Sequence, residues 1–161
     1  MIKCILENGQ EVNFRHVTVG ALVTNEKNEI LLVRRASGIV RSGFYTVPGG
    51  FLDQNENAAQ AVIRELQEET GYAGKVEVLF RINDNPNRPK EDRQNVDFLF
   101  IVKVTGGEMI LNKEVDEIKW FSKDKLPSED NFAFDHRATI LKYFEYLEKP
   151  FSLPIVGAYN L

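Results

Sequence analysis

Four glutamates with distinctive spacing lie between positions 56 and 69 of this chain. They are Glu56, Glu65, Glu68 and Glu69, and Arg64 directly precedes the last three. Residues three and four positions apart lie on one face of a helix, so this spacing predicts that Glu65, Glu68 and Glu69 converge. Carboxylates this close repel one another unless a cation lies between them, and carboxylate oxygens are ligands of hard divalent metals. The segment therefore predicts a metal site with oxygen ligands.

The run from position 50 to 72, GFLDQNENAAQAVIRELQEETGY, resembles the Nudix box. The family pattern is a glycine, five residues, a glutamate, seven residues, Arg-Glu, an aliphatic residue, any residue, Glu-Glu, any residue, a glycine and a bulky apolar residue. Every defined position is filled here, by Gly50, Glu56, Arg64, Glu65, Leu66, Glu68, Glu69, Gly71 and Tyr72. The resemblance implies a Nudix pyrophosphohydrolase, which cleaves the diphosphate linkage of a nucleoside diphosphate derivative.

The resemblance also implies a metal cofactor, Mg²⁺ or alternatively Mn²⁺. Its ligands would be the carboxylates of Glu65, Glu68 and Glu69, together with the carbonyl oxygen of Gly50 as the first glycine of the box. Glu114 is a further candidate ligand, because some family members supply an acid from the segment before the last strand. Glu114 lies six residues before Trp120, and its neighbours Asp116 and Glu117 are the alternatives.

Two further roles follow from the same resemblance. Arg64 completes the catalytic set with the three glutamates, because it would pair with box carboxylates, Glu56 among them, and hold their orientation. The group that takes the proton from the attacking water stays open between Glu65 and an acid from the later segment.

Candidate substrate-binding residues lie outside the box. Alternation along a strand puts Arg34 and Arg35 on opposite faces, so at most one of them points at a phosphate. Arg35 is favoured, and an ordinary surface arginine is the alternative. The other candidates are Arg41, Phe44, Tyr45 and Arg88. One of the two aromatic residues would stack on a base while the other packs in the core. Arg88 belongs to a polar loop over 83–95, which either closes over the substrate or is an ordinary surface loop.

The stretch FAFDHRATILKYF at 132–144 resembles the start of the C-terminal helix in the ADP-ribose pyrophosphatase-type branch of the family. It favours ADP-ribose or a similar nucleotide sugar as the substrate. Two alternatives stay open: a house-cleaning pyrophosphatase for modified nucleoside triphosphates, and a nucleotide-sensing module that binds without cleaving. Within this stretch Asp135 is predicted to cap the helix, and His136 is interpreted as structural.

Periodicity predicts the elements that must position these residues. A hairpin is expected over 2–14, with its turn at Asn8-Gly9, and a second hairpin is expected to join 17–24 to 29–35. The segment TVPGG, at 46–50, predicts a sharp turn before the box helix. Further strands are expected at 76–82, 96–104 and 117–121, and a second helix at 135–147.

The box helix is predicted to begin after Asn55 or Asn57 and to end at Gly71. Its apolar arc, which would pack on the sheet, consists of Ala59, Val62, Ile63 and Leu66. Strands around one central helix with a second helix at the end indicate an α/β class. The resemblance makes this the Nudix fold, an α/β/α sandwich with a mixed central β-sheet.

Length and composition bound the remaining possibilities. The 161 residues predict one domain over 1–161, with ordinary apolar (43%) and charged (27%) fractions. A net charge of −4 argues mildly against a nucleic-acid partner. The partner that the resemblance implies is a small nucleotide substrate. The single Cys4 and the absence of long apolar runs favour a cytoplasmic protein without a membrane partner. The apolar tail at 151–161 is expected to pack on the body or on a second subunit, so a homodimer stays open.

Overall fold

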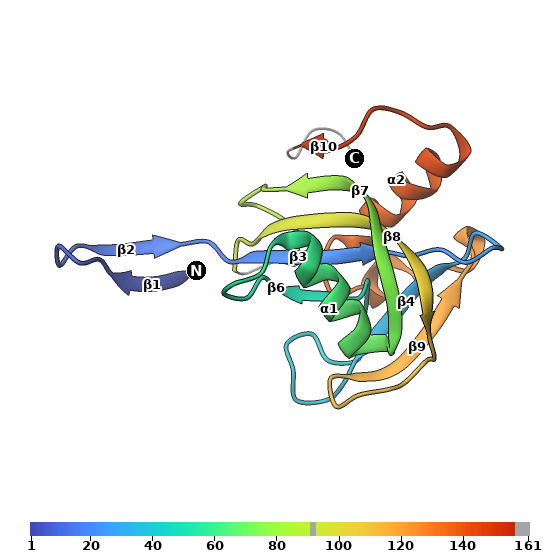
Figure 1. The fold of residues 1–161 in the computed structure, drawn as a ribbon, viewed down its shortest axis with the longest axis horizontal. Coiled ribbons are helices and arrows are strands. Elements are labelled where there is room, and N and C mark those ends of the chain that lie inside the picture. The colour runs from blue at the N-terminus through green and yellow to red at the C-terminus, as the bar shows by residue number, and fades with distance from the viewer. Residues whose placement is uncertain (91–92, 157–161) are drawn as a thin grey trace.

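The strands of the protein form two sheets and a separate hairpin in a computed structural model that describes residues 1–90 and 93–156 (Figure 1). The strands are β1 (Ile2–Ile5), β2 (Glu11–Phe14), β3 (Val17–Leu22), β4 (Ile30–Arg35), β5 (Tyr45–Thr46), β6 (Gly49–Phe51), β7 (Tyr72–Asn83), β8 (Val96–Gly107), β9 (Val115–Phe121) and β10 (Ile155–Val156). The helices are α1 (Ala58–Thr70) and α2 (His136–Glu148), with short 3₁₀ turns at Lys123–Lys125 and Glu129–Asn131. Among these described helices, none has the length and apolar character that a membrane crossing requires.

The larger sheet is mixed and has the strand order β10-β7-β8-β3-β6. Strand β3 runs parallel to β8 and antiparallel to β6, while β7 and β8 form a long antiparallel pair. The smaller sheet is antiparallel, in the order β5-β4-β9. The mixed sheet therefore carries the start of the box on its edge strand β6.

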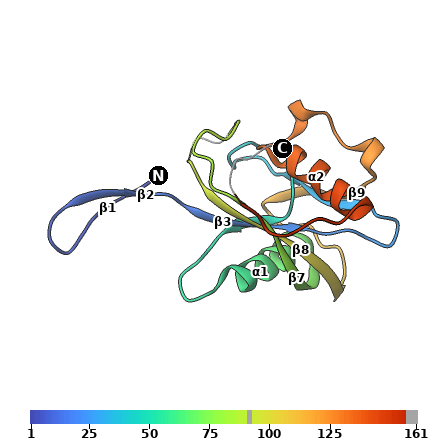
Figure 2. The same cartoon turned by 90° about the horizontal axis from the view of Figure 1, so that it is seen from above.

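The two helices lie on opposite sides of the strands, as Figure 2 shows. Helix α1 buries Ala61, Val62 and Leu66 in a core shared with β3 and β4. Helix α2 buries Ile140 and Phe144 in a second core on the other side. This arrangement confirms the predicted α/β/α sandwich with a mixed sheet.

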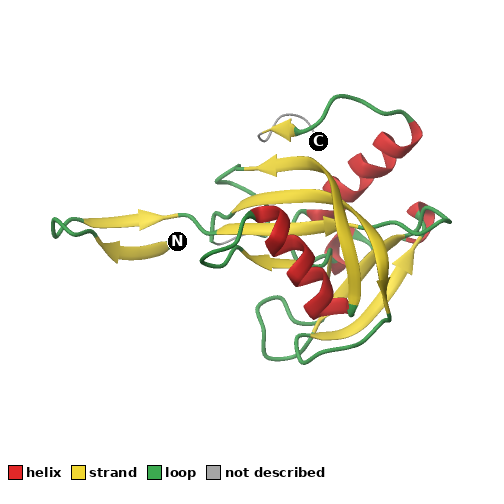
Figure 3. Cartoon of the chain, viewed as in Figure 1, coloured by secondary structure: helices red, strands yellow, loops and turns green. Residues whose placement is uncertain are grey.

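The N-terminal hairpin is confirmed, and it extends away from the body of the molecule (Figure 3). The second predicted hairpin is correct only at its turn. Thr24 bridges Ile30 across that turn, but β3 then joins the mixed sheet and β4 joins the smaller one. The chain separates here because the apolar residues of both strands fill the space between the sheets.

Two local predictions are corrected by the structure. The expected turn at 46–50 includes part of β6, because Gly49 and Gly50 pair with Gly20 and Val19 on β3. Ala59 is exposed and lies outside the buried face of α1, which is centred on Ala61, Val62 and Leu66 instead.

The tail packs on the body as far as it is described. Phe151 contacts the rings of Phe80 and Tyr146, and β10 pairs in parallel with β7. Positions 157–161 of the predicted tail lie outside the described residues.

Candidate active site

Local capping determines where the box helix begins and ends. The Asn57 side chain accepts a hydrogen bond from the Gln60 backbone N–H, and the Gln60 side chain accepts one from the Asn57 N–H in return. At the other end Gly71 adopts a left-handed conformation with φ of 78°, which glycine tolerates without steric cost. Both predicted ends are confirmed, with Asn57 rather than Asn55 as the cap. The register of the box carboxylates follows from these two caps.

Glu69 is the most deeply placed carboxylate of the box. Its side chain points toward β6, where an oxygen accepts a hydrogen bond from the Gly49 backbone N–H at 2.9 Å. Burial raises the pKa of Glu69 to about 8; the Gly49 hydrogen bond and the charge of Arg35 oppose this shift, and the negative charges of Glu65 and Glu114 add to it. A buried carboxylate with so high a pKa gains stability from any cation beside it.

Glu65 lies against the same strand, one residue further along. A Cβ atom placed on Gly50 would collide with the Glu65 carboxylate, so only glycine leaves room for it. Burial raises the pKa of Glu65, although the hydrogen bond from Arg64 counteracts this effect. Consecutive residues of β6 therefore contact two carboxylates of α1.

Arg64 gathers the remaining acids of the box. Its guanidinium donates to Glu56 at 2.7 Å, to Glu65 at 2.8 Å and to Glu68 at 3.1 Å, and also to the Phe51 carbonyl at 3.0 Å. The hydrogen bonds from Arg64 hold the pKa of Glu56 below its ordinary value. Arg64 therefore contacts the box carboxylates, Glu56 among them, as the resemblance implies, and its orienting role stays a prediction.

The structure does not bring the three predicted metal ligands together equally. Glu65 and Glu69 face β6, whereas Glu68 is exposed and turns to Arg64. In residues 1–90 and 93–156, no group of three acidic, histidine or cysteine side chains is already arranged to hold a metal. The donors nevertheless fit a hard divalent cation, since they are carboxylates, Glu65 and Glu69 both lie against β6, and the pKa of the buried Glu69 is strongly raised. Arg64 contacts one oxygen each of Glu65 and Glu68, so the second oxygen of each carboxylate would be left for such a cation.

Glu114 approaches this group from the segment that precedes β9. Its side chain is exposed, and its charge contributes to the raised pKa values of Glu65 and Glu69. Asn112 fixes this segment on α1: its amide nitrogen donates to the Glu68 carbonyl at 2.6 Å, and its side-chain oxygen accepts from the Glu114 N–H at 2.8 Å. Asn112 was not among the predicted site residues, although an asparagine two residues before an acid is a signal for this local turn.

The alternative acids, Asp116 and Glu117, lie within β9 and are engaged elsewhere. Arg34 bonds Asp116 at 2.8 Å and lies 3.4 Å from Glu117, which also accepts a hydrogen bond from the Tyr45 hydroxyl. The side chain of Arg34 therefore points toward β9, whereas that of Arg35 lines the pocket described next. The two side chains point in different directions, as strand alternation predicts.

A pocket of about 100 Å³ begins where β6 meets the carboxylates. Gly49 and Gly50 form one side, and Arg35 lines it together with the aromatic rings of Phe51 and Phe134. Buried polar residues form its inner end: Thr46, Arg88, Asn95, Asp97 and His136. The pocket and the box carboxylates thus share the two glycines of β6.

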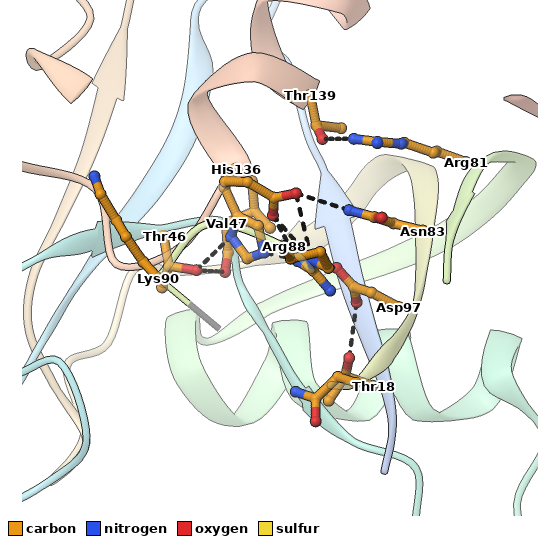
Figure 4. Close-up of polar contacts among 12 residues, drawn as sticks. Thr18, Thr46, Val47, Arg81, Asn83, Arg88, Lys90, Asp97, His136 and Thr139 are labelled. Carbon is orange, nitrogen blue, oxygen red and sulfur yellow. Dashed lines mark hydrogen bonds and ion pairs between the residues drawn. The ribbon is translucent and has the colours of Figure 1, made fainter. Parts of the chain in front are cut away.

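The inner end of the pocket is a connected polar network, drawn in Figure 4. Arg88 donates to Asp135 at 2.6 Å and lies 3.4 Å from Asp97. Asn83 donates to the other oxygen of Asp135 at 2.8 Å. Asp135 is the N-cap residue of α2, as predicted, but its side chain makes no capping hydrogen bond because Asn83 and Arg88 engage it. His136 is buried and contacts Thr46 at 2.7 Å, in agreement with its structural interpretation.

The predicted substrate residues divide into two groups. Arg35 and Arg88 line the pocket, but Arg88 is buried in ion pairs rather than presented by a surface loop. The other three are not part of its described lining: Arg41 donates to the Lys90 carbonyl, Tyr45 packs on Phe121, and Phe44 is half-buried beside it. Asp97 and Phe134 were missed, although a charged residue inside the apolar strand 96–104 is itself a signal.

Comparison with known proteins gives consistent matches. Residues 14–143 match the family described as NUDIX domain. An ADP-ribose pyrophosphatase of Methanocaldococcus jannaschii is 32% identical over 124 residues, which cover 77% of this chain and 70% of the relative. An 8-oxo-dGTP diphosphatase of Escherichia coli is 44% identical over 55 residues, which cover 34% of this chain and 42% of that protein.

Solved structures show the same fold. A NUDIX hydrolase from Nitrosomonas europaea superposes with a TM-score of 0.77 at 22% identity, covering 97% of this chain and 92% of its own. A UDP-X diphosphatase superposes with a TM-score of 0.73 at 22% identity, covering 94% of this chain and 70% of its own.

Proposed function

The chain belongs to the Nudix hydrolase family, and from this premise we propose that it cleaves the diphosphate linkage of ADP-ribose or a similar nucleotide sugar. One observation carries the proposal: the buried Glu69 carboxylate is bonded to Gly49, which also lines the pocket. A linear substrate can therefore place its diphosphate at the carboxylates and its nucleoside in the pocket. The ADP-ribose pyrophosphatase relative supports a nucleotide sugar as the preferred substrate.

In this proposal Glu65 and Glu69 hold a divalent cation, Mg²⁺ or Mn²⁺, with the Gly50 carbonyl, Glu68 and Glu114 as further ligands. The cation supplies Lewis acidity to the phosphate oxygens and to the attacking water. Arg64 keeps Glu65 and Glu68 oriented through the bonds at 2.8 and 3.1 Å.

Two further groups complete the proposed chemistry. Arg35 lines the pocket, and its charge acts on both Glu69 and Glu114, so it is placed to neutralise a phosphate between them. Glu65 is a suited proton acceptor for the attacking water because burial raises its pKa, and Glu114 is the alternative.

The test is a product assay with purified protein, Mg²⁺ and ADP-ribose, with products separated by chromatography. The expected products are AMP and ribose 5-phosphate. Glu69→Gln should lose at least about 100-fold in rate, because it removes the charge but little volume. Glu77→Gln makes the same change at an exposed position on β7 and should keep the wild-type rate. Equal rates for the two variants would refute the assignment of Glu69.

A second candidate activity is pyrophosphate release from modified nucleoside triphosphates. The 8-oxo-dGTP diphosphatase relative favours it, through a 55-residue match at 44% identity. The same assay separates the two activities, because triphosphate cleavage yields a nucleoside monophosphate and pyrophosphate. Turnover of triphosphates without turnover of ADP-ribose would select this second activity.

A further inference from the structure

A buried carboxylate lies at the inner end of the pocket. Asp97 is the second residue of β8, and only 3% of its surface is exposed. One of its oxygens, Oδ1, accepts a hydrogen bond from the Thr18 hydroxyl at 3.0 Å (Figure 4). A charged side chain this deep in a strand costs free energy unless it has partners or a function.

The second oxygen of Asp97, Oδ2, has only long contacts within the described part of the chain. Arg88 Nη2 lies 3.4 Å from it and His136 Nε2 lies 3.6 Å from it. Bonds between a cationic nitrogen and a carboxylate oxygen are usually about 2.7–2.9 Å long. Both neighbours are held back by closer partners, Arg88 by Asp135 at 2.6 Å and His136 by Thr46 at 2.7 Å. Oδ2 therefore retains capacity for one short hydrogen bond.

Asp97 is an acceptor in its ionised form. Burial alone would raise its pKa, but the nearby His136 ring and the charge of Arg88 outweigh burial and hold the pKa below its usual value. An ionised carboxylate can only accept hydrogen bonds, so it favours a ligand that presents an N–H group and disfavours one that presents a carbonyl.

The walls of the pocket suit a flat ring. Phe51 lies under the guanidinium of Arg93 at 5.5 Å, and Phe134 lies under that of Arg35 at 5.7 Å. Bases stack on aromatic side chains, with added attraction from arginine. A volume of about 100 Å³ is below the range of about 300–1,000 Å³ usual for whole-ligand pockets. The enclosed part therefore accommodates only one end of a nucleotide.

We propose that Asp97 determines base specificity, by accepting a hydrogen bond at Oδ2 from the exocyclic amino group of the nucleobase. The inference rests on the proposed function, because it places the nucleoside end of the substrate in the pocket. It adds a substrate requirement that the box does not read, since the box contacts only the diphosphate and the metal.

The test compares nucleotides that differ by one amino group. Calorimetric titration of the wild-type protein would measure Kd for AMP against purine riboside 5′-monophosphate, and for GMP against IMP. Loss of a hydrogen bond to a charged group predicts about 10- to 100-fold weaker binding of the analogue in at least one pair. The pair whose two Kd values differ identifies the base that the pocket recognises. Equal Kd values within both pairs, or no binding of any of the four, would overturn the proposal.

Two variants identify the acceptor. In the wild-type protein, one nucleotide pair should show two different Kd values. Asp97→Asn should reduce the ratio of these two Kd values to about threefold or less, because a neutral amide replaces the charged acceptor. Asp124→Asn is the matched control, since it makes the same change at an exposed position outside the pocket lining and without contact to Arg88. It should leave the ratio unchanged. An unaltered ratio in Asp97→Asn, or equal narrowing in both variants, would refute the role of Asp97.

Neither variant has to fold for the central comparison, which uses wild-type protein alone. Binding is also measured without turnover, so failure of the proposed function is distinguishable. Selective binding without hydrolysis of ADP-ribose or triphosphates would refute the proposed hydrolysis and leave the role of Asp97 standing.

Discussion

Replacing Glu69 by glutamine is expected to remove a pH-dependent loss of stability from the metal-free protein. Burial raises the pKa of Glu69 from 4.5 to about 8. The charged groups that act on it come from three parts of the fold: Glu65 on α1, Arg35 on β4 and Glu114 before β9, and the Gly49 N–H on β6 also bonds it. In the unfolded chain this carboxylate returns to its ordinary pKa, so folding and protonation are linked.

The sign and size of the effect follow from this shift. The folded state binds the proton more tightly, so the stabilisation is complete below pH 4.5 and is lost as the pH rises toward 8. Each unit of pH inside this window changes the free energy of unfolding by about 1.4 kcal/mol. From pH 5 to pH 7 the wild-type protein should lose about 3 kcal/mol relative to Glu69→Gln, which has no charge to gain. The depressed pKa values of Asp97 and Asp135 act at lower pH, outside this window.

Urea unfolding at pH 5, 6 and 7 in the presence of EDTA measures this difference. The wild-type free energy of unfolding should fall relative to that of Glu69→Gln across the series, and added Mg²⁺ should restore stability to the wild type only. Glu77→Gln serves as the control, because its carboxylate is exposed on β7. Parallel pH dependences for the wild type and Glu69→Gln would show that the Glu69 carboxylate is not perturbed by burial, which would refute the reasoning.

Three other substitutions test the surroundings of the carboxylates. Gly50→Ala should lower the hydrolysis rate about 10- to 100-fold, because its Cβ displaces Glu65, whereas Gly106→Ala, with no heavy atom within 4 Å of an added Cβ, should remain active; equal rates would contradict this. Arg64→Lys should weaken Mn²⁺ affinity about 10-fold or more in a metal titration, since an ammonium cannot reproduce the guanidinium bonds to Glu56, Glu65 and Glu68; unchanged affinity would exclude the orienting role. Asn112→Ala should lower kcat about 10-fold with little change in KM, because it releases Glu114. Asn85→Ala breaks a similar local turn in a distant part of the sequence and should keep the wild-type kcat. An equal loss of kcat in both variants would indicate general destabilisation instead.

The box helix could be predicted closely because local interactions define it. Asn57, Gln60 and Gly71 cap the helix through residues at most four positions away, so the sequence contains the whole signal. The error at Ala59 had a different cause. Apolar periodicity does not distinguish a small alanine that faces solvent from one that packs in the core. In the structure the buried face of α1 is centred on Ala61 and Leu66.

The separation of β3 from β4 could not be read from the chain. A polar turn between two apolar strands predicts a hairpin, but β3 pairs instead with β8, whose partner residues lie 79 positions away. Such long-range pairing depends on which apolar faces meet in the core. The pocket has the same origin, since Thr18, Asp97 and His136 come from three distant segments. Of these three residues, only Asp97 could have been recognised from its local sequence, as an acid within an apolar strand.

The three residues of β6 link the two halves of the site. The Gly49 N–H bonds Glu69, Gly50 leaves room for Glu65, and the Phe51 carbonyl accepts from Arg64 while the Phe51 ring lines the pocket. Strand β6 is in turn paired to β3, where Thr18 lies opposite Phe51 and donates to Asp97. The proposed specificity residue and the proposed metal ligands are therefore positioned by the same pair of strands. A substitution that shifts β6 should change rate and base preference together, whereas Asp97→Asn should change base preference alone.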